Sequence, residues 1–66
     1  MKLIRLISNT GSDTYECTDR QADRAIADHR SDPKRLFSVT VEHRGGSVTH
    51  SSKNVVDVRE VRDGGR

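Results

Sequence analysis

The chain has 66 residues and carries 12 Lys and Arg against 10 Asp and Glu, which gives a net charge of +2. That length holds one small domain, and so small a positive surplus is not by itself a sign of nucleic-acid binding. The single cysteine excludes an internal disulfide bond, and three histidines beside it make a thin set of metal ligands.

Residues 2–8 form the first predicted strand, and it is apolar on both faces. Leu3 and Ile7 point to one side, while Ile4 and Leu6 point to the other. Arg5 interrupts the apolar run, so the segment lacks the core of a signal peptide. No apolar stretch approaches the roughly 20 residues that span a bilayer. We therefore expect a cytoplasmic protein with no membrane partner.

Turn-forming residues at 9–13 lead into a second predicted strand, 14–17, with Tyr15 and Cys17 on one face, which completes a β-hairpin. A capping box follows, because Thr18 and Gln21 stand three residues apart. Small and apolar residues at helical spacing then predict a helix over 19–30. Pro33 ends it, since the residue before proline is pushed out of the helical region.

Residues 35–52 are interpreted as a long hairpin. Phe37, Val39, Val41 and His43 share one face of its first strand, which places Phe37 in the core. The 44–47 segment fits a two-residue turn centred on Gly45-Gly46, with residue 44 opposite 47. In that register Val48 faces His43 and His50 faces Val41, and both join the apolar side.

A polar connector at 51–54 precedes the last predicted strand, 55–61. Alternation places Val56 and Val58 on one face and Val55 and Val61 on the other, so this strand is also apolar on two sides. Residues 62–66 are expected to form a flexible tail. The predicted organisation is one domain over 1–61 followed by that tail.

The element order ββαβββ predicts an α+β fold, with the first and last strands as neighbours in a strongly bent antiparallel sheet and one helix packed on it. The polar connector at 51–54 is similar to the short turn before the final strand of SH3-like small barrels, which implies a barrel-like closure. Cores of chains below about 70 residues seldom supply more than about 3–5 kcal/mol. We therefore expect a protein partner, a homo-oligomer, or both.

No catalytic motif is found, so we expect a protein that is not an enzyme and uses no cofactor. His43 and His50 are diagonal neighbours in the predicted register, and Cys17 could approach them. A metal site needs three or four converging ligands. We therefore expect these three residues to be core or core-rim side chains rather than metal ligands.

Nucleic-acid binding is the second hypothesis. The first 32 residues have a net charge of −1 and the last 34 a net charge of +3. A small β-barrel could contact phosphate through basic residues of that second half, namely Lys34, Arg35, Arg44, Lys53, Arg59 and Arg62. Single-strand binders add aromatic side chains for base stacking. Here Tyr15 and Phe37 are not interleaved with the basic residues, which weakens the hypothesis.

A ββα start followed by a late strand and Gly64-Gly65 resembles a ubiquitin-type β-grasp modifier with one trailing residue, Arg66. The resemblance implies joining to other proteins through a processed Gly-Gly end. It is the third hypothesis.

The first hypothesis is a small non-catalytic protein-binding module. It would act through an exposed β edge or through the apolar face left over on the terminal strands. The residues expected to contact the partner are Leu3, Arg5, Val55, Arg59 and Val61. Arg outnumbers Lys by nine to three and Asp outnumbers Glu by seven to three. That bias indicates a GC-rich bacterium or its phage, and the size fits a regulatory or inhibitory role.

Overall fold

A computed structural model describes residues 1–61, so the predicted tail at 62–66 and the Gly64-Gly65 pair lie outside the described residues. The elements in chain order are β1 (Lys2–Ser8), β2 (Gly11–Cys17), α1 (Asp19–Arg30), β3 (Ser38–His43), β4 (Gly46–Ser51), a 3₁₀ turn η1 (Ser52–Asn54) and β5 (Val55–Val61). The predicted α+β class and the ββαβββ order are confirmed. Within this part of the chain, no helix is long and apolar enough to cross a membrane.

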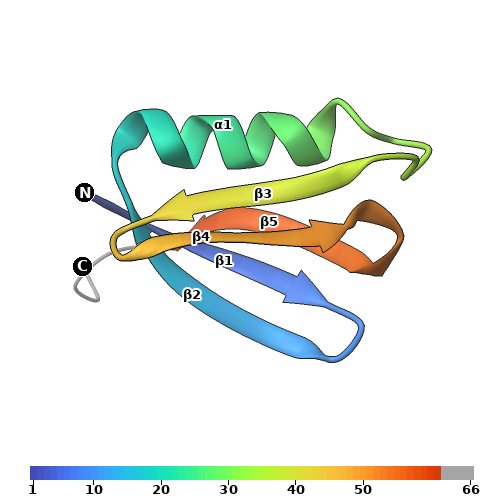
Figure 1. The fold of residues 1–66 in the computed structure, drawn as a ribbon, viewed down its shortest axis with the longest axis horizontal. Coiled ribbons are helices and arrows are strands. Elements are labelled where there is room, and N and C mark those ends of the chain that lie inside the picture. The colour runs from blue at the N-terminus through green and yellow to red at the C-terminus, as the bar shows by residue number, and fades with distance from the viewer. Residues whose placement is uncertain (62–66) are drawn as a thin grey trace.

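The five strands form two antiparallel sheets (Figure 1). One sheet has the strand order β2-β1-β5, so the first and last strands are neighbours as predicted and β1 is central. The other sheet is the β3-β4 hairpin, and α1 lies along β3. A hydrogen bond of 2.8 Å from the Arg44 N–H to the Glu16 carbonyl links the two sheets at one corner.

Helix α1 begins and ends where the local sequence predicts. The Thr18 hydroxyl accepts from the Gln21 N–H at 3.1 Å, and the Gln21 side-chain oxygen accepts from the Thr18 N–H at 2.9 Å. This reciprocal pair is the predicted capping box. Ala22 and Ala25 are fully buried, so the small residues of the helix let its backbone approach the sheets closely.

Two predicted turns are shorter or shifted. In the first hairpin, Ser8 pairs with Gly11, so only Asn9 and Thr10 turn and the second strand starts at Gly11 rather than at Thr14. In the second hairpin, His43 pairs with Gly46, so the turn is Arg44-Gly45 and not Gly45-Gly46. Gly45 and Gly46 both have positive φ, so glycine preference alone does not distinguish a turn at Arg44-Gly45 from a turn at Gly45-Gly46. The true register differs by two positions, which leaves every side chain on its predicted face.

Strand β5 departs from simple alternation. Its pairing with β1 is irregular, because Ile7 pairs with Asp57 and Ser8 pairs with Val55. This bulge inserts Val56, which is 48% exposed, and turns Val55 into the core beside Val58. The prediction that Val55 faces away from Val58 is therefore wrong. The same bulge removes Val55 from the predicted contact surface.

The core lies between the two sheets and α1. Its fully or almost fully buried members come from every helix and strand except β4, and they are Ile4, Leu6, Cys17, Ala22, Ala25, Val39, Val41, Val55 and Val58. Tyr15, Ile26 and Val48 pack against it. The prediction of Phe37 as a core residue is wrong, because its side chain is 72% exposed. Strand β3 starts at Ser38, so Phe37 lies just outside the strand and the alternation of the strand does not determine which way its side chain points.

Candidate functional site

The outer face of the three-stranded sheet, which points away from the core, brings together four of the five predicted contact residues. Leu3 pairs with Val61, and Arg5 pairs with Arg59 across the β1-β5 ladder. On the other side of β1, the ladder with β2 adds Glu16 next to Leu3. The position of these four residues on one face follows from the period of two in an extended strand.

Three apolar side chains on the outer face are not used by the core. Leu3, Ile7 and Val61 are half-buried, and none of them belongs to the core cluster or to the residues packed against it. The neighbouring elements α1 and β3 contribute their buried residues to the opposite face of the sheet, and Val48 of β4 packs against the same core. Among residues 1–61, no helix or strand therefore covers the outer face.

The middle row of the outer face holds two arginines, because Arg5 lies on the central strand between Thr14 of β2 and Arg59 of β5. The rows on either side each hold a carboxylate, with Glu16 beside Leu3 and Asp57 beside Ile7. Arg59 Nε lies 3.4 Å from the Asp57 carboxylate, whereas Arg5 makes no ion pair with any residue of the described range. Asp57 also lies 3.8 Å from His29 Nε2, which connects the β5 edge to α1. Arg5 is therefore the charge at the centre of the face that is left for a partner's carboxylate.

The free edge of β2 is the other surface that the first hypothesis allows. Apart from the single bond to Arg44, no strand of the described chain pairs with this edge. Its exposed residues include no large apolar side chain, and they are Gly11, Ser12, Asp13, Thr14 and Glu16. A partner strand paired with this edge would bury little apolar surface against the side chains of β2.

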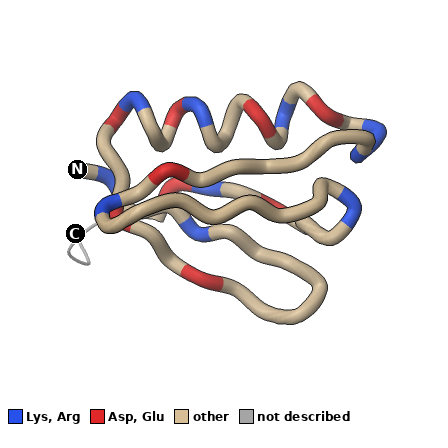
Figure 2. The backbone as a smooth tube through the Cα atoms, viewed as in Figure 1, with Lys and Arg blue, Asp and Glu red and all other residues tan. Residues whose placement is uncertain are grey.

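The basic residues of the nucleic-acid hypothesis do not form one patch (Figure 2). Arg44 lies in the β3-β4 turn, 3.6 Å from Glu16, and Arg59 belongs to the outer face. Lys53 lies beyond the other end of the hairpin, separated from Arg44 by about 17 Å of strand. Only Lys34, Arg35 and Lys53 share an end of the molecule, and Arg62 lies outside the described residues.

The histidine pair is separated by the corrected register. His43 pairs with Gly46 and His50 pairs with Val39, so the two rings stand four positions, or about 13 Å, apart along the hairpin. The His43 ring instead stacks on Tyr15 with centroids 4.7 Å apart, and its Nδ1 donates to the Arg44 carbonyl at 2.9 Å. Burial raises the pKa of the Cys17 thiol, which keeps it protonated. Across residues 1–61, no three potential ligands converge on one point.

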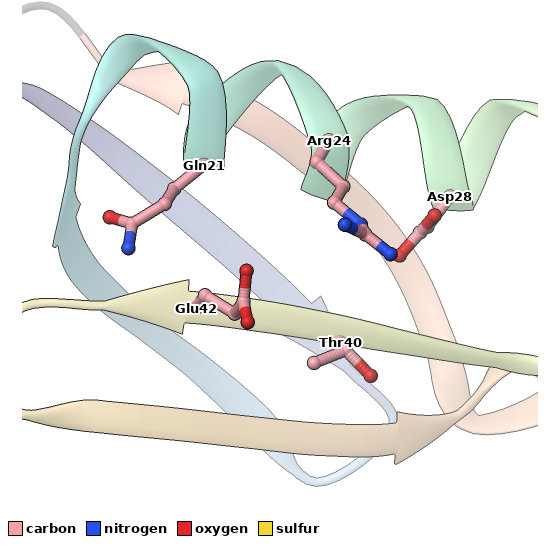
Figure 3. Close-up of a pocket in the computed structure, with 5 residues that line it drawn as sticks. All are labelled: Gln21, Arg24, Asp28, Thr40 and Glu42. Atoms are coloured by element: carbon pink, nitrogen blue, oxygen red, sulfur yellow. The ribbon is translucent and has the colours of Figure 1, made fainter.

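A small polar pocket of about 150 Å³ lies between α1 and β3 (Figure 3). Its lining combines both charges, with the Arg24 guanidinium directed toward Asp28 and with Glu42 rising from β3. Gln21 also lines it, but its side-chain oxygen is engaged in the capping box. Thr40 completes the lining, which holds no histidine or cysteine.

These features define a small α+β domain whose β2-β1-β5 sheet carries four of the five predicted contact residues on one face. No protein-family model, curated protein or solved structure matches this chain.

Proposed function

We propose that this protein is a protein-binding module and that the outer face of the β2-β1-β5 sheet is its contact surface. The supporting observation is the group of Leu3, Ile7 and Val61 on a face that no described element covers, with Arg5 and Arg59 between them. Apolar patches interrupted by arginine are typical of interaction surfaces, because Arg is enriched in interfaces and apolar burial supplies affinity.

The partner is a protein segment with carboxylates flanked by apolar side chains. A second copy of the same face fits poorly. Arg5 lies at the centre of the face, so in a symmetric face-to-face dimer it meets its own copy, and Arg59 adds a second cation in the same row. Like charges brought together in an interface cost affinity. Aspartate or glutamate opposite Arg5 removes this conflict.

The sheet face is a better contact surface than the β2 edge. The edge offers backbone groups flanked by polar side chains, whereas the face offers three apolar side chains in two rows. In this proposal the partner lies on the sheet and does not extend it by a further strand.

A photo-crosslinking amino acid at position 14, the exposed β2 residue beside Arg5 on the outer face, tests the proposal in the cells that make the protein and leaves Arg5 in place. Position 47 on the exposed part of β4 is the matched control position. We expect position 14 to capture a different protein, and we expect the crosslinked peptide of that protein to be rich in Asp or Glu. Val61→Asp and Arg59→Glu should each lower the yield at least about tenfold, since interface anchors contribute more than about 1.4 kcal/mol. Lys34→Glu, which changes an exposed charge on the α1-β3 loop and not on the outer face, should leave the yield unchanged.

Three outcomes contradict the proposal. They are capture of a second copy of the chain, equal capture from positions 14 and 47, and unchanged capture by the Val61→Asp variant when its circular dichroism spectrum is native. Self-association has a separate control, because a dimer would shift the thermal midpoint over about a hundredfold dilution.

A further inference from the structure

The loop between α1 and β3 is folded around one buried carboxylate. Asp32 is 7% exposed, and its two oxygens accept from the Leu36 N–H at 2.8 Å and the Phe37 N–H at 2.9 Å. The Asp32 carbonyl accepts from the Arg35 N–H at 3.0 Å. Three backbone bonds to one residue fix the loop in a single conformation.

The carboxylate stays ionised in this position. The neighbouring Ser52 hydroxyl lowers the pKa of Asp32 most, burial opposes it, and the N–H groups of Leu36, Phe37 and Arg35 lower the pKa further. Ser52 is itself buried, at 3% exposure, so its hydroxyl and the Asp32 carboxylate are both shielded from solvent. The negative charge of Asp32 is therefore directed into the loop and not toward solvent.

The fixed loop presents large apolar side chains to solvent. Leu36 is 69% exposed and Phe37 is 72% exposed. Between Asp32 and these two residues, Arg35 has φ 57°, a left-handed conformation that non-glycine residues seldom adopt. Backbone of this kind is found preferentially at binding sites, where the surrounding contacts hold it. Phe37 is thus displayed by a structured loop.

Basic side chains approach Phe37 from two chain segments. Lys34 and Arg35 precede it on the loop, and both are exposed. Lys53 follows Ser52, whose N–H donates to the Phe37 carbonyl at 3.0 Å, so exposed Lys53 lies one residue from a direct contact with Phe37. Asp32, the one acidic residue of this loop, is buried. The site therefore combines one exposed aromatic ring with three cations.

We propose that Phe37, Lys34, Arg35 and Lys53 form a binding site for single-stranded nucleic acid. In this arrangement a base stacks on the Phe37 ring, and the three cations contact phosphates on either side of it. Sites for single strands use this combination, because every base has a stacking face and every linkage carries a negative charge. The ligand is a single strand, since base pairing hides the flat faces of duplex bases.

Two further features favour nucleic acid over a protein at this loop. Two of the three cations are lysines, and lysine is depleted in protein interfaces but is an ordinary phosphate contact. Helix α1 has a mixed exposed face with Asp19, Asp23 and Asp28 among its arginines, so it is not a helix that could enter a duplex groove. The loop is the one cationic surface with an exposed ring among the described residues.

The test is fluorescence anisotropy of the full chain with labelled oligo-dT and oligo-U of about 15 nucleotides. With three phosphate contacts, log Kd against log salt should have a slope of about 2. Phe37→Ala should weaken binding by about 5- to 150-fold, the effect of losing one stacked base. Leu36→Ala is the matched control, because Leu36 is equally exposed on the same loop but cannot stack, and it should change Kd less than about twofold.

The basic residues have their own control pair. Lys53→Ala should reduce the salt slope by about 0.7. Arg44→Ala, at the other end of the hairpin, should leave the slope unchanged. The four substituted side chains, those of Leu36, Phe37, Arg44 and Lys53, are all exposed. The thermal midpoint of each variant should therefore stay near that of the wild type, and this measurement checks that the variant is folded.

Several results overturn the inference. They are absence of oligonucleotide binding at low salt, equal effects of Phe37→Ala and Leu36→Ala, and stronger binding to duplex than to single strands. Binding to vesicles of phosphatidylglycerol that depends on both Leu36 and Phe37, without oligonucleotide binding, would assign the loop to a lipid surface. None of these results bears on the outer face, so this site and the proposed protein contact can fail independently.

Discussion

The capping box of α1 makes a quantitative prediction for Thr18→Ala. The substitution removes the hydroxyl that accepts from the Gln21 N–H at 3.1 Å and frees the Gln21 side chain that accepts from the Thr18 N–H at 2.9 Å. Loss of an N-cap residue costs about 1 kcal/mol, within a range of about 0.5–2. Against a core worth about 3–5 kcal/mol, this is a large fraction of the free energy of unfolding.

The expected change is readily measured. A loss of about 1 kcal/mol lowers the thermal midpoint of a domain of this size by about 4–8 °C. Far-UV circular dichroism follows the helix directly, and urea unfolding supplies the free energy. Helix α1 has 12 residues, a length at which an isolated helix is only marginal. The helix therefore depends on its cap and on its packing, and the effect should lie in the upper half of the range.

Two control variants separate the cap from general damage. Thr18→Ser keeps the accepting oxygen and should retain most of the stability. Thr18→Ala combined with Gln21→Ala should cost less than the sum of the two single changes, because both remove the same reciprocal pair. The reasoning is refuted if Thr18→Ala lowers the free energy of unfolding by less than about 0.3 kcal/mol, or if Thr18→Ser is equally harmful.

Four further predictions concern the core, the turn, the bulge and the loop. Leu6→Ala should cost about 2–5 kcal/mol and leave the chain largely unfolded by circular dichroism at 25 °C, since Leu6 is buried at 1% exposure. Gly45→Ala should lower the urea midpoint by the equivalent of about 1 kcal/mol; an added Cβ meets no atom within 4 Å, so the cost comes from φ 99° and not from a clash. Val55→Asp should prevent folding while Val56→Asp leaves a native spectrum, and the opposite result would place the bulge elsewhere. The pKa of Asp32 is lower in the folded than in the unfolded chain, so the stability that its charge contributes should be fully present above the unfolded pKa of about 4. This stability should be lost as the pH falls through the folded pKa. The urea midpoints of the wild type and of Asp32→Asn should therefore converge in strong acid.

The parts of the fold that local chemistry determines could be predicted from the sequence. Thr18 and Gln21 are three residues apart and Pro33 follows the helix, so both ends of α1 are encoded within a few residues. Strands β1 and β5 were predicted with their full bounds, and their pairing follows from their apolar residues on both faces. The alternation within these strands also places Leu3, Arg5, Arg59 and Val61 on one face, and their contact with a partner stays a prediction.

The wrong predictions concern residues whose position depends on contacts with residues outside their own strand. The bulge that buries Val55 depends on how β5 meets Ile7 and Ser8, which alternation within 55–61 does not encode. Phe37 fits the alternation of apolar residues in the strand that follows it. Its N–H, however, donates to the Asp32 carboxylate, so Phe37 belongs to the loop and not to the sheet. The sequence does contain a signal for this loop. Asp32 follows the helix and precedes Leu36 by four residues and Phe37 by five, and an aspartate side chain can accept hydrogen bonds from backbone N–H groups at such short separations.

The pairing of β1 with β5 also affects when the protein can fold during synthesis. Leu3 meets its partner Val61 only after the 57 residues between them have been made, so the central strand lacks one of its two neighbours until β5 has been synthesised. Contacts that close such long loops slow folding. Until then the apolar side chains of β1 and its unpaired edge are exposed on the nascent chain, which favours aggregation during that interval.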